Sequence, residues 1–219
     1  MQLDYPINED YIVFYTQYFN DNGKAIELLN RCYNLTDINV FPRRLVNQLA
    51  RTISFTDFTF SHRLGNRSFQ IFMWMALIES YEYTLNPEID SEKVDKLGVI
   101  LKFFRTYLSK ADNDLLVKHL KRSIVDKRFN NNSELPIDII SRIFYSIRNE
   151  FSHGLEYHTS LFSDSNENNF LESINLREFK KDSKENRYFE MSITHEQLRG
   201  VIIRASLNLI HEQINQSTS

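Results

Sequence analysis

The segment over residues 66–85 constrains the fold more than any other, because it is apolar on almost every side of a helix. Its apolar positions do not keep to one stripe, and they include Phe69, Phe72, Met73, Met75, Ala76, Leu77 and Tyr81. Such a helix is stable only when other elements cover it all round. Pro87 then ends it, since proline disfavours helical geometry in the residue before it. The sequence therefore predicts a central core helix.

Helical patterns fill most of the remaining chain. Apolar residues at helical spacing predict further helices over residues 9–19, 24–32, 42–53, 92–108, 112–124, 136–154 and 195–214. The expected N-terminal signals are Asn8, Pro42, Ser91, Asp112 or Asn113, Pro136, and the capping-box pair Thr194 and Gln197. Residues 54–64 alternate and are aromatic, which fits an extended segment or a loop. Only 5 Gly and 4 Pro argue against a β-sandwich.

A β-hairpin is expected between the last two helices. Residues 173–179 and 187–193 flank a turn-like DSKEN sequence, and the second of these segments alternates between apolar and polar residues. The expected fold class is therefore all-α: a helical bundle of about six to eight helices with a small β-hairpin inserted before the C-terminal helix. We expect two parts, an N-terminal helical extension over residues 1–60 packed on a main helical domain over residues 61–219.

Charge and cysteine content limit the class of protein. The formal net charge is −3, so any contact with nucleic acid must come from a local patch. Cys32 is the single cysteine and is expected to be a small buried apolar residue. The sequence has no Cys/His cluster with zinc spacing, and no metal or cofactor is expected. The first residues lack a secretory pattern and the longest apolar run, residues 71–78, is too short to span a bilayer, so a cytoplasmic protein without membrane contact is expected.

The helix expected over residues 136–154 ends in a segment that can carry chemistry, residues 148–153 (RNEFSH). A guanidinium such as that of Arg148 binds phosphate oxygens and stabilises the charge that develops on them. An imidazole such as that of His153 titrates near neutral pH and can move the proton of a 2′-hydroxyl. Together these two side chains would allow RNA cleavage without a metal.

The spacing of this pair sets a geometric condition. Residues five apart lie about 140° from each other around a regular helix. Arg148 and His153 therefore meet only if the chain turns at Ser152 or Gly154, or if two subunits face each other. Chance gives about 0.4 Arg–His pairs at this spacing in a chain of this composition, and about 0.04 when Asn must follow the Arg. The segment that includes Asn149 is thus more specific than the pair alone.

The sequence IRNEFSHG, residues 147–154, resembles the signature of the HEPN superfamily: Arg, a polar residue that is often Asn, a short spacer and His. Residues 68–83 (SFQIFMWMALIESYEY) resemble the long core helix that precedes the signature in many members, with an acidic position that is here Glu79. The resemblance covers roughly residues 60–215, and only the short signature is specific. It implies an all-α domain that often dimerises, so that two signatures build one shared site.

The resemblance also implies a function. Many members are metal-independent endoribonucleases of toxin–antitoxin or phage-defence systems, so the expected partners are an RNA substrate, a second copy of the chain and an antitoxin protein. At the matching positions, Arg148 is the phosphate-binding and transition-state residue, Asn149 the polar orienting residue and His153 the catalytic acid/base. Some HEPN toxins carry a Tyr two residues after the His, which a partner nucleotidyltransferase modifies. Leu155 stands there in this chain, which puts regulation by that route in doubt.

Other residues are secondary candidates. Lys118, Lys121 and Arg122 lie on one expected helix and are candidates for an RNA-binding stripe, although a charged outer face is the simpler interpretation. His158 is a candidate RNA contact in a polar loop. Glu79 is a candidate for an inward carboxylate that holds Arg148 by hydrogen bonds.

Two other functions stay open. A non-catalytic HEPN-like module would use the same pocket to bind a nucleotide, RNA or a protein. A helical interaction protein would carry the signature by accident; Arg148 would then pair with Glu150 or Glu156 on the surface, and His153 would stabilise the C-terminus of the helix. The complete set of Arg148, Asn149 and His153 favours the nuclease, because a pure binder has no need of the histidine.

Overall fold

The computed structural model describes residues 6–61, 67–90, 92–121, 137–154, 171–174, 187–190 and 193–218. These residues contain eight helices, so the all-α class is confirmed. The helices are α1 (Glu9–Phe19), α2 (Asn22–Asn34), α3 (Phe41–Ser61), α4 (Arg67–Leu85), α5 (Lys96–Tyr107), α6 (Lys110–Lys121), α7 (Ile137–Gly154) and α8 (His195–Thr218).

Two short strands lie between α7 and α8 in the sequence, β1 (Leu171–Ile174) and β2 (Arg187–Glu190). They pair antiparallel, with Leu171 opposite Glu190 and Ile174 opposite Arg187. The segment that connects them lies outside the described residues, as does most of the region predicted as a hairpin. The hairpin as a whole therefore stays a prediction.

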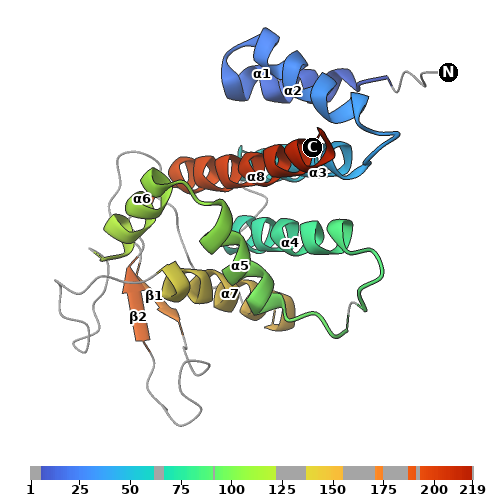
Figure 1. Cartoon of the computed structure of the whole chain (residues 1–219). Coiled ribbons are helices and arrows are strands. Elements are labelled where there is room, and N and C mark those ends of the chain that lie inside the picture. The colour runs from blue at the N-terminus through green and yellow to red at the C-terminus, as the bar shows by residue number, and fades with distance from the viewer. Residues whose placement is uncertain are drawn as a thin grey trace.

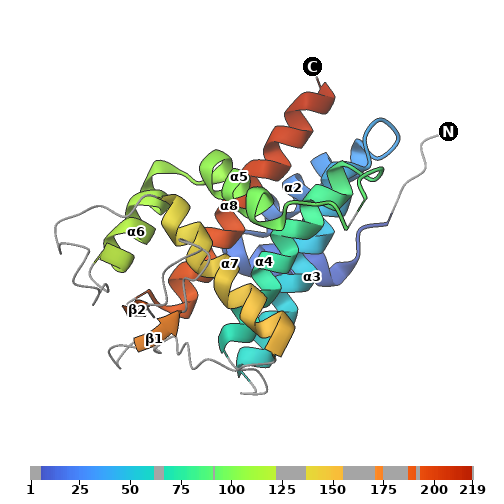
Figure 2. The same ribbon diagram turned by 90° about the horizontal axis from the view of Figure 1, so that it is seen from below.

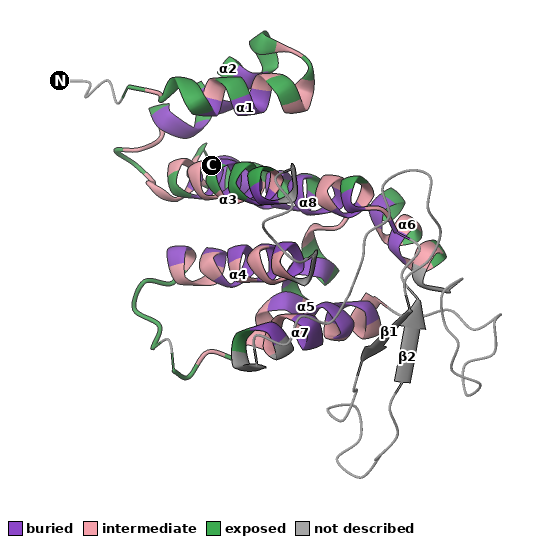
Figure 3. Ribbon diagram, turned by 180° about the vertical axis from the view of Figure 1, so that it is seen from behind, coloured by how far each residue is buried: buried purple, intermediate pink, exposed green. Residues whose placement is uncertain are grey.

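The helices are arranged in layers (Figures 1 and 3). An outer pair, α1 and α2, lies over α3 and α8, and α4 lies between α3 and α7, while α5 contacts α4, α7 and α8. Seen from below, α3, α4 and α7 lie side by side (Figure 2). One hydrophobic core runs through all of these layers, from Tyr11 in α1 to Ile214 in α8. The predicted boundary at residue 60 falls at the end of α3, whose residues Leu45, Leu49 and Ile53 are fully buried in this same core.

The prediction of a central core helix over residues 66–85 is confirmed in α4. Its residues Ile71, Trp74, Met75 and Ile78 are all at most 1% exposed. The helix packs against α3 on one side and against α5 and α7 on the other. No helix within the described ranges combines the length and the apolar character that crossing a membrane requires.

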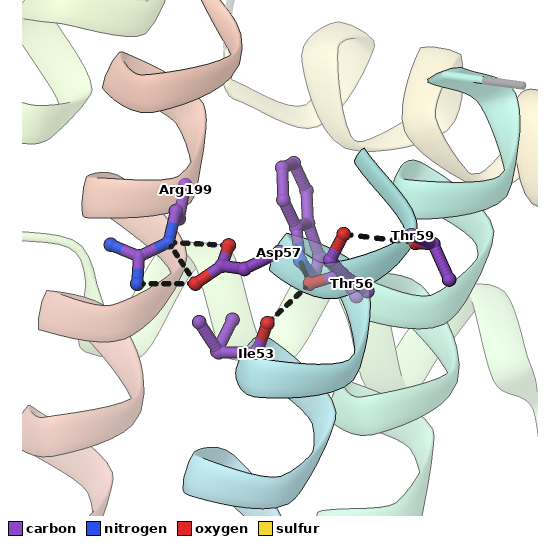
Figure 4. Close-up of polar contacts among 6 residues, drawn as sticks. Ile53, Thr56, Asp57, Thr59 and Arg199 are labelled. Carbon is purple, nitrogen blue, oxygen red and sulfur yellow. Dashed lines mark hydrogen bonds and ion pairs between the residues drawn. The ribbon is translucent and has the colours of Figure 1, made fainter. Parts of the chain in front are cut away.

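The expectation that residues 54–64 form an extended segment or a loop was wrong for the residues described, because α3 continues to Ser61. The hydroxyls of Thr56 and Thr59 donate to the carbonyls of Ile53 and Thr56 within the helix, both at 2.9 Å (Figure 4). Thr56 also accepts a hydrogen bond from the indole nitrogen of Trp74 at 3.2 Å. These contacts satisfy buried hydroxyls inside a helix that packs on α4, and packing outweighs the alternating pattern.

Some predicted caps were right and two were wrong. Asn8 accepts from the backbone amide of Asp10 at 2.8 Å, and Thr194 and Gln197 form the predicted capping box. Helix α5 is capped by Asp95 and not by Ser91, since the Asp95 carboxylate accepts from the amide of Gly98 at 3.0 Å.

Helix α6 begins at Lys110, before the predicted start at Asp112 or Asn113. The cap is Ser109, whose hydroxyl accepts from the amide of Asp112 at 3.1 Å and donates to its carboxylate at 2.7 Å. Asp112 is therefore the third residue of the helix and bonds to the capping Ser109 through both its amide and its carboxylate.

Candidate functional site

Arg148 lies on α7 beside the apolar face that holds this helix in the bundle. Ile143 and Ile147 on that face are at most 2% exposed, and Phe151 one turn further is 8% exposed. The face packs against α4 and α5. The apolar face predicted from the four-residue spacing is therefore buried. Arg148 lies at the edge of this face, with its side chain 11% exposed.

Glu79 of α4 holds the guanidinium of Arg148 with two hydrogen bonds. The Nε of Arg148 donates to Oε1 of Glu79 at 2.7 Å, and Nη2 donates to Oε2 at 2.8 Å. The Glu79 side chain is 6% exposed, so the pair is largely shielded from water. This is the contact that the sequence predicted for Glu79, and the bidentate geometry fixes both the position and the plane of the guanidinium.

The third guanidinium nitrogen points along α7 toward its C-terminal end. Nη1 of Arg148 donates to the side-chain oxygen of Asn149 at 3.3 Å and to the hydroxyl of Ser152 at 3.2 Å. Ser152 is exposed and donates in turn to the carbonyl of Asn149 at 3.0 Å. The guanidinium is thus anchored on its inner side and reaches solvent beside Ser152.

Aromatic rings form a wall next to this guanidinium. The Arg148 guanidinium carbon lies 5.9 Å from the centroid of the Phe72 ring. Phe72 contacts Phe151 at a centroid distance of 4.8 Å, and Phe69 contacts Phe151 at 5.7 Å and Phe55 of α3 at 6.0 Å. Because Phe55 is 49% exposed, the wall extends from the buried pair Arg148–Glu79 to the surface.

Ser152 and Phe72 were missed by the sequence reasoning, although a signal for the serine was present. Residues four apart are neighbours on a helix surface, and Ser152 follows Arg148 at that spacing. No comparable local signal exists for Phe72, because its contact with Arg148 depends on how α4 and α7 pack.

The backbone of α7 continues without a break through Ser152 to Gly154. Of the two routes by which Arg148 and His153 could meet, a turn of the chain at Ser152 is therefore absent. A regular helix rotates by about 100° per residue, so the Cα atoms of these two residues lie about 140° apart around α7. The side chain of His153 lies outside the described residues.

The secondary candidates are only partly described. Lys118 is exposed on α6, as both interpretations of the basic stripe require. Lys121 is the last residue of that helix, and its side chain lies outside the described residues, as do Arg122 and His158 entirely. No contact in the described part of the chain joins Lys118 to Arg148.

The part of the chain that the structure describes contains no cluster of metal-ligating side chains and no accessible cysteine. No three His, Cys, Asp or Glu side chains gather there as ligands of an ion would. Cys32 is fully buried, and this burial raises the pKa of its thiol to about 12. It is thus the core residue that the sequence predicted.

Comparisons with protein-family models, with curated proteins and with solved structures find no match to this chain. The resemblance to HEPN domains therefore stays a prediction from the sequence.

Proposed function

We propose that this chain is a metal-independent endoribonuclease of the HEPN type, with a composite active site at a homodimer interface, in a toxin–antitoxin or phage-defence system. The observation that carries the proposal is the guanidinium of Arg148. Glu79 fixes it from the inner side, and its Nη1 faces the exposed hydroxyl of Ser152. A cation with a fixed plane and a solvent-facing edge suits the binding of a phosphate and of the charge that develops during its cleavage.

The proposed reaction uses the RNA's own 2′-hydroxyl as the nucleophile. His153 takes the proton of this hydroxyl while the 2′-oxygen attacks the adjacent phosphorus. The bond from phosphorus to the 5′-oxygen breaks, and this oxygen leaves with a proton from a second acid. The products are a 2′,3′-cyclic phosphate and a 5′-hydroxyl. Arg148 stabilises the negative charge on the phosphoryl oxygens, and Asn149 orients the guanidinium through its side-chain oxygen.

The proposal requires a second copy of the chain to bring a His153 side chain close to Arg148. On one regular helix His153 lies too far around the axis to serve the phosphate that Arg148 binds. In a symmetric dimer the same surface of each subunit meets itself, so two α7 ends would face each other. His153 of one subunit then acts with Arg148 of the other, and water supplies the proton to the leaving 5′-oxygen.

One observation favours the alternative, a non-catalytic module that binds RNA, a nucleotide or a protein. Glu79 carries a negative charge against Arg148 and occupies both its Nε and its Nη2. Because Glu79 partly neutralises the guanidinium, Arg148 would stabilise the negative charge of a phosphoryl transition state less. A binding module needs only the N–H donors of Arg148 that Glu79 does not occupy.

Cleavage of RNA in EDTA separates the two functions. Purified full-length protein incubated with RNA and EDTA should produce 2′,3′-cyclic phosphate ends, and His153→Ala should abolish them. His211→Ala is the matched control, because it removes an exposed histidine from α8 and should leave cleavage unchanged. If the wild type and His153→Ala leave RNA equally intact but bind it equally in an anisotropy titration, the binding module is correct and the nuclease is excluded.

A further inference from the structure

A groove lies on the other side of the bundle from Arg148, between α1 and α3. Its volume is about 630 Å³, and Arg199 of α8 completes its lining. Binding sites for small molecules commonly have volumes of about 300–1,000 Å³. None of the lining residues belongs to the site around Arg148, which α4, α7 and Phe55 of α3 form. The groove is therefore a separate feature with the size of a ligand site.

Arg51 of α3 is an oriented cation in this groove. Its Nε donates to the hydroxyl of Tyr11 at 2.5 Å, and its guanidinium carbon lies 5.6 Å from the centroid of the same ring. Arg51 is exposed, and the structure describes no acidic partner for its two terminal amino groups. Such a guanidinium offers parallel N–H donors that match a carboxylate or a phosphate.

The second arginine of the groove differs, because its charge is already balanced. Asp57 accepts from Nε of Arg199 at 2.8 and 3.0 Å and from Nη2 at 2.7 Å, and Figure 4 shows the two side chains directed at each other from α3 and α8. The other carboxylate of the lining is Asp10, which lies in the first turn of α1, where the positive end of the helix favours its charge. Arg51 is thus the cation of the groove that is open to a ligand.

Aromatic and amide groups of α1 supply the remaining lining. Tyr11, Phe14 and Tyr18 recur along one face of the helix and form an aromatic side of the groove. Burial raises the pKa of Tyr18, so its hydroxyl stays neutral and can both donate and accept. Gln17, which is exposed, adds an amide with donors and an acceptor. Flat apolar faces beside such polar groups suit a ring that carries hydrogen-bonding substituents.

We propose that the groove between α1 and α3 binds a small organic anion with a flat ring. Arg51 holds the anionic group, the aromatic side of α1 contacts the ring, and Gln17 contacts its polar edge. An aromatic carboxylate and a nucleoside monophosphate share this chemistry. The proposal does not depend on the function of Arg148 and stands if RNA cleavage is not observed.

Isothermal titration of the full-length protein tests this site. The ligands are two ring-bearing anions, 4-hydroxybenzoate and adenosine 5′-monophosphate. Adenosine and inorganic phosphate are titrated as well, as the separate parts of the monophosphate. We expect at least one ring-bearing anion to bind with a Kd below about 1 mM. Arg51→Gln should weaken this binding tenfold or more, by about 1.4 kcal/mol, and Gln17→Ala should weaken it less.

Arg44→Gln is the matched control, because it removes an exposed arginine from the same helix outside the groove. It should leave the Kd unchanged, and circular dichroism should show the same helix content in all variants. The proposal is overturned if neither ring-bearing anion binds with a Kd below about 1 mM. It is also overturned if Arg51→Gln and Arg44→Gln have equal effects, or if inorganic phosphate alone binds as tightly as the monophosphate.

Discussion

Replacing Glu79 by Gln should destabilise the fold strongly, because it leaves the guanidinium of Arg148 without its counter-charge. The Arg148 and Glu79 side chains are only 11% and 6% exposed. Removing one member of a buried ion pair costs about 3–5 kcal/mol. A glutamine keeps the shape and one acceptor oxygen, so part of the hydrogen bonding survives. We therefore expect a loss of about 2–4 kcal/mol in the free energy of unfolding at pH 7.

Urea unfolding followed by circular dichroism measures this loss, and a double variant shows its cause. Glu79→Leu and Arg148→Met should each cost about 3–5 kcal/mol alone, since each leaves the other charge buried. The double variant replaces the pair with apolar side chains of similar size and should cost far less than the sum. Glu88→Gln, which changes an exposed glutamate in the turn after α4, should stay within about 0.5 kcal/mol of the wild type.

Two results would refute this reasoning. One is a cost of Glu79→Gln below about 1 kcal/mol, which would mean that water reaches the guanidinium. The other is additivity of the single variants in the double variant, which would mean that the two side chains do not stabilise each other.

Three further predictions concern other buried or paired groups. Asp112→Ala should cost about 1–3 kcal/mol, because Arg204 loses a bidentate partner but is 45% exposed and can be hydrated instead. Asp138→Asn should lower the urea midpoint slightly at pH 7; the hydrogen bond from Arg105 lowers the pKa of Asp138 below 3.8, so this contribution is lost as the pH falls through the lowered pKa. Cys32, buried and with a pKa of about 12, should not react with a thiol reagent at pH 8 until urea unfolds the chain.

Each of these predictions has a control or an opposing result. Asp114→Ala changes an exposed aspartate on the same helix as Asp112, and an equal loss from both would contradict the role of the ion pair. A stability difference for Asp138→Asn that persists unchanged at pH 2 would show that its charge is not involved. Rapid labelling of Cys32 in the folded protein would show that the core around α2 opens readily.

The contact between Arg148 and Glu79 was predictable because a carboxylate on a helix that is apolar on almost every side must be buried. A buried charge needs a partner, and the signature offered a cation on a neighbouring helix. The central position of α4 followed from the same pattern. These features depend on residue type and on helical period, which the sequence displays directly.

The features that could not be predicted depend on how the helices pack, which local sequence patterns do not specify. The aromatic alternation of residues 54–64 has the period of a strand, yet the packing of Thr56 against Trp74 keeps this part of α3 helical. Several residues before α5 can cap a helix, and the sequence alone does not say that Asp95 is the one that does. The groove beside Arg51 depends on the distance between α1 and α3, for which the sequence contains no measure.

Mixing two inactive variants tests the composite nuclease site most directly. Arg148→Lys keeps a charge opposite Glu79 but loses the two-pronged donor geometry, and His153→Ala removes the acid/base. Each variant alone should fail to cleave RNA in EDTA. After the two are unfolded together and refolded, random pairing gives half mixed dimers with one intact site of two, so about a quarter of the wild-type rate should return. An active wild type whose mixed variants show no recovery would contradict a site shared between subunits.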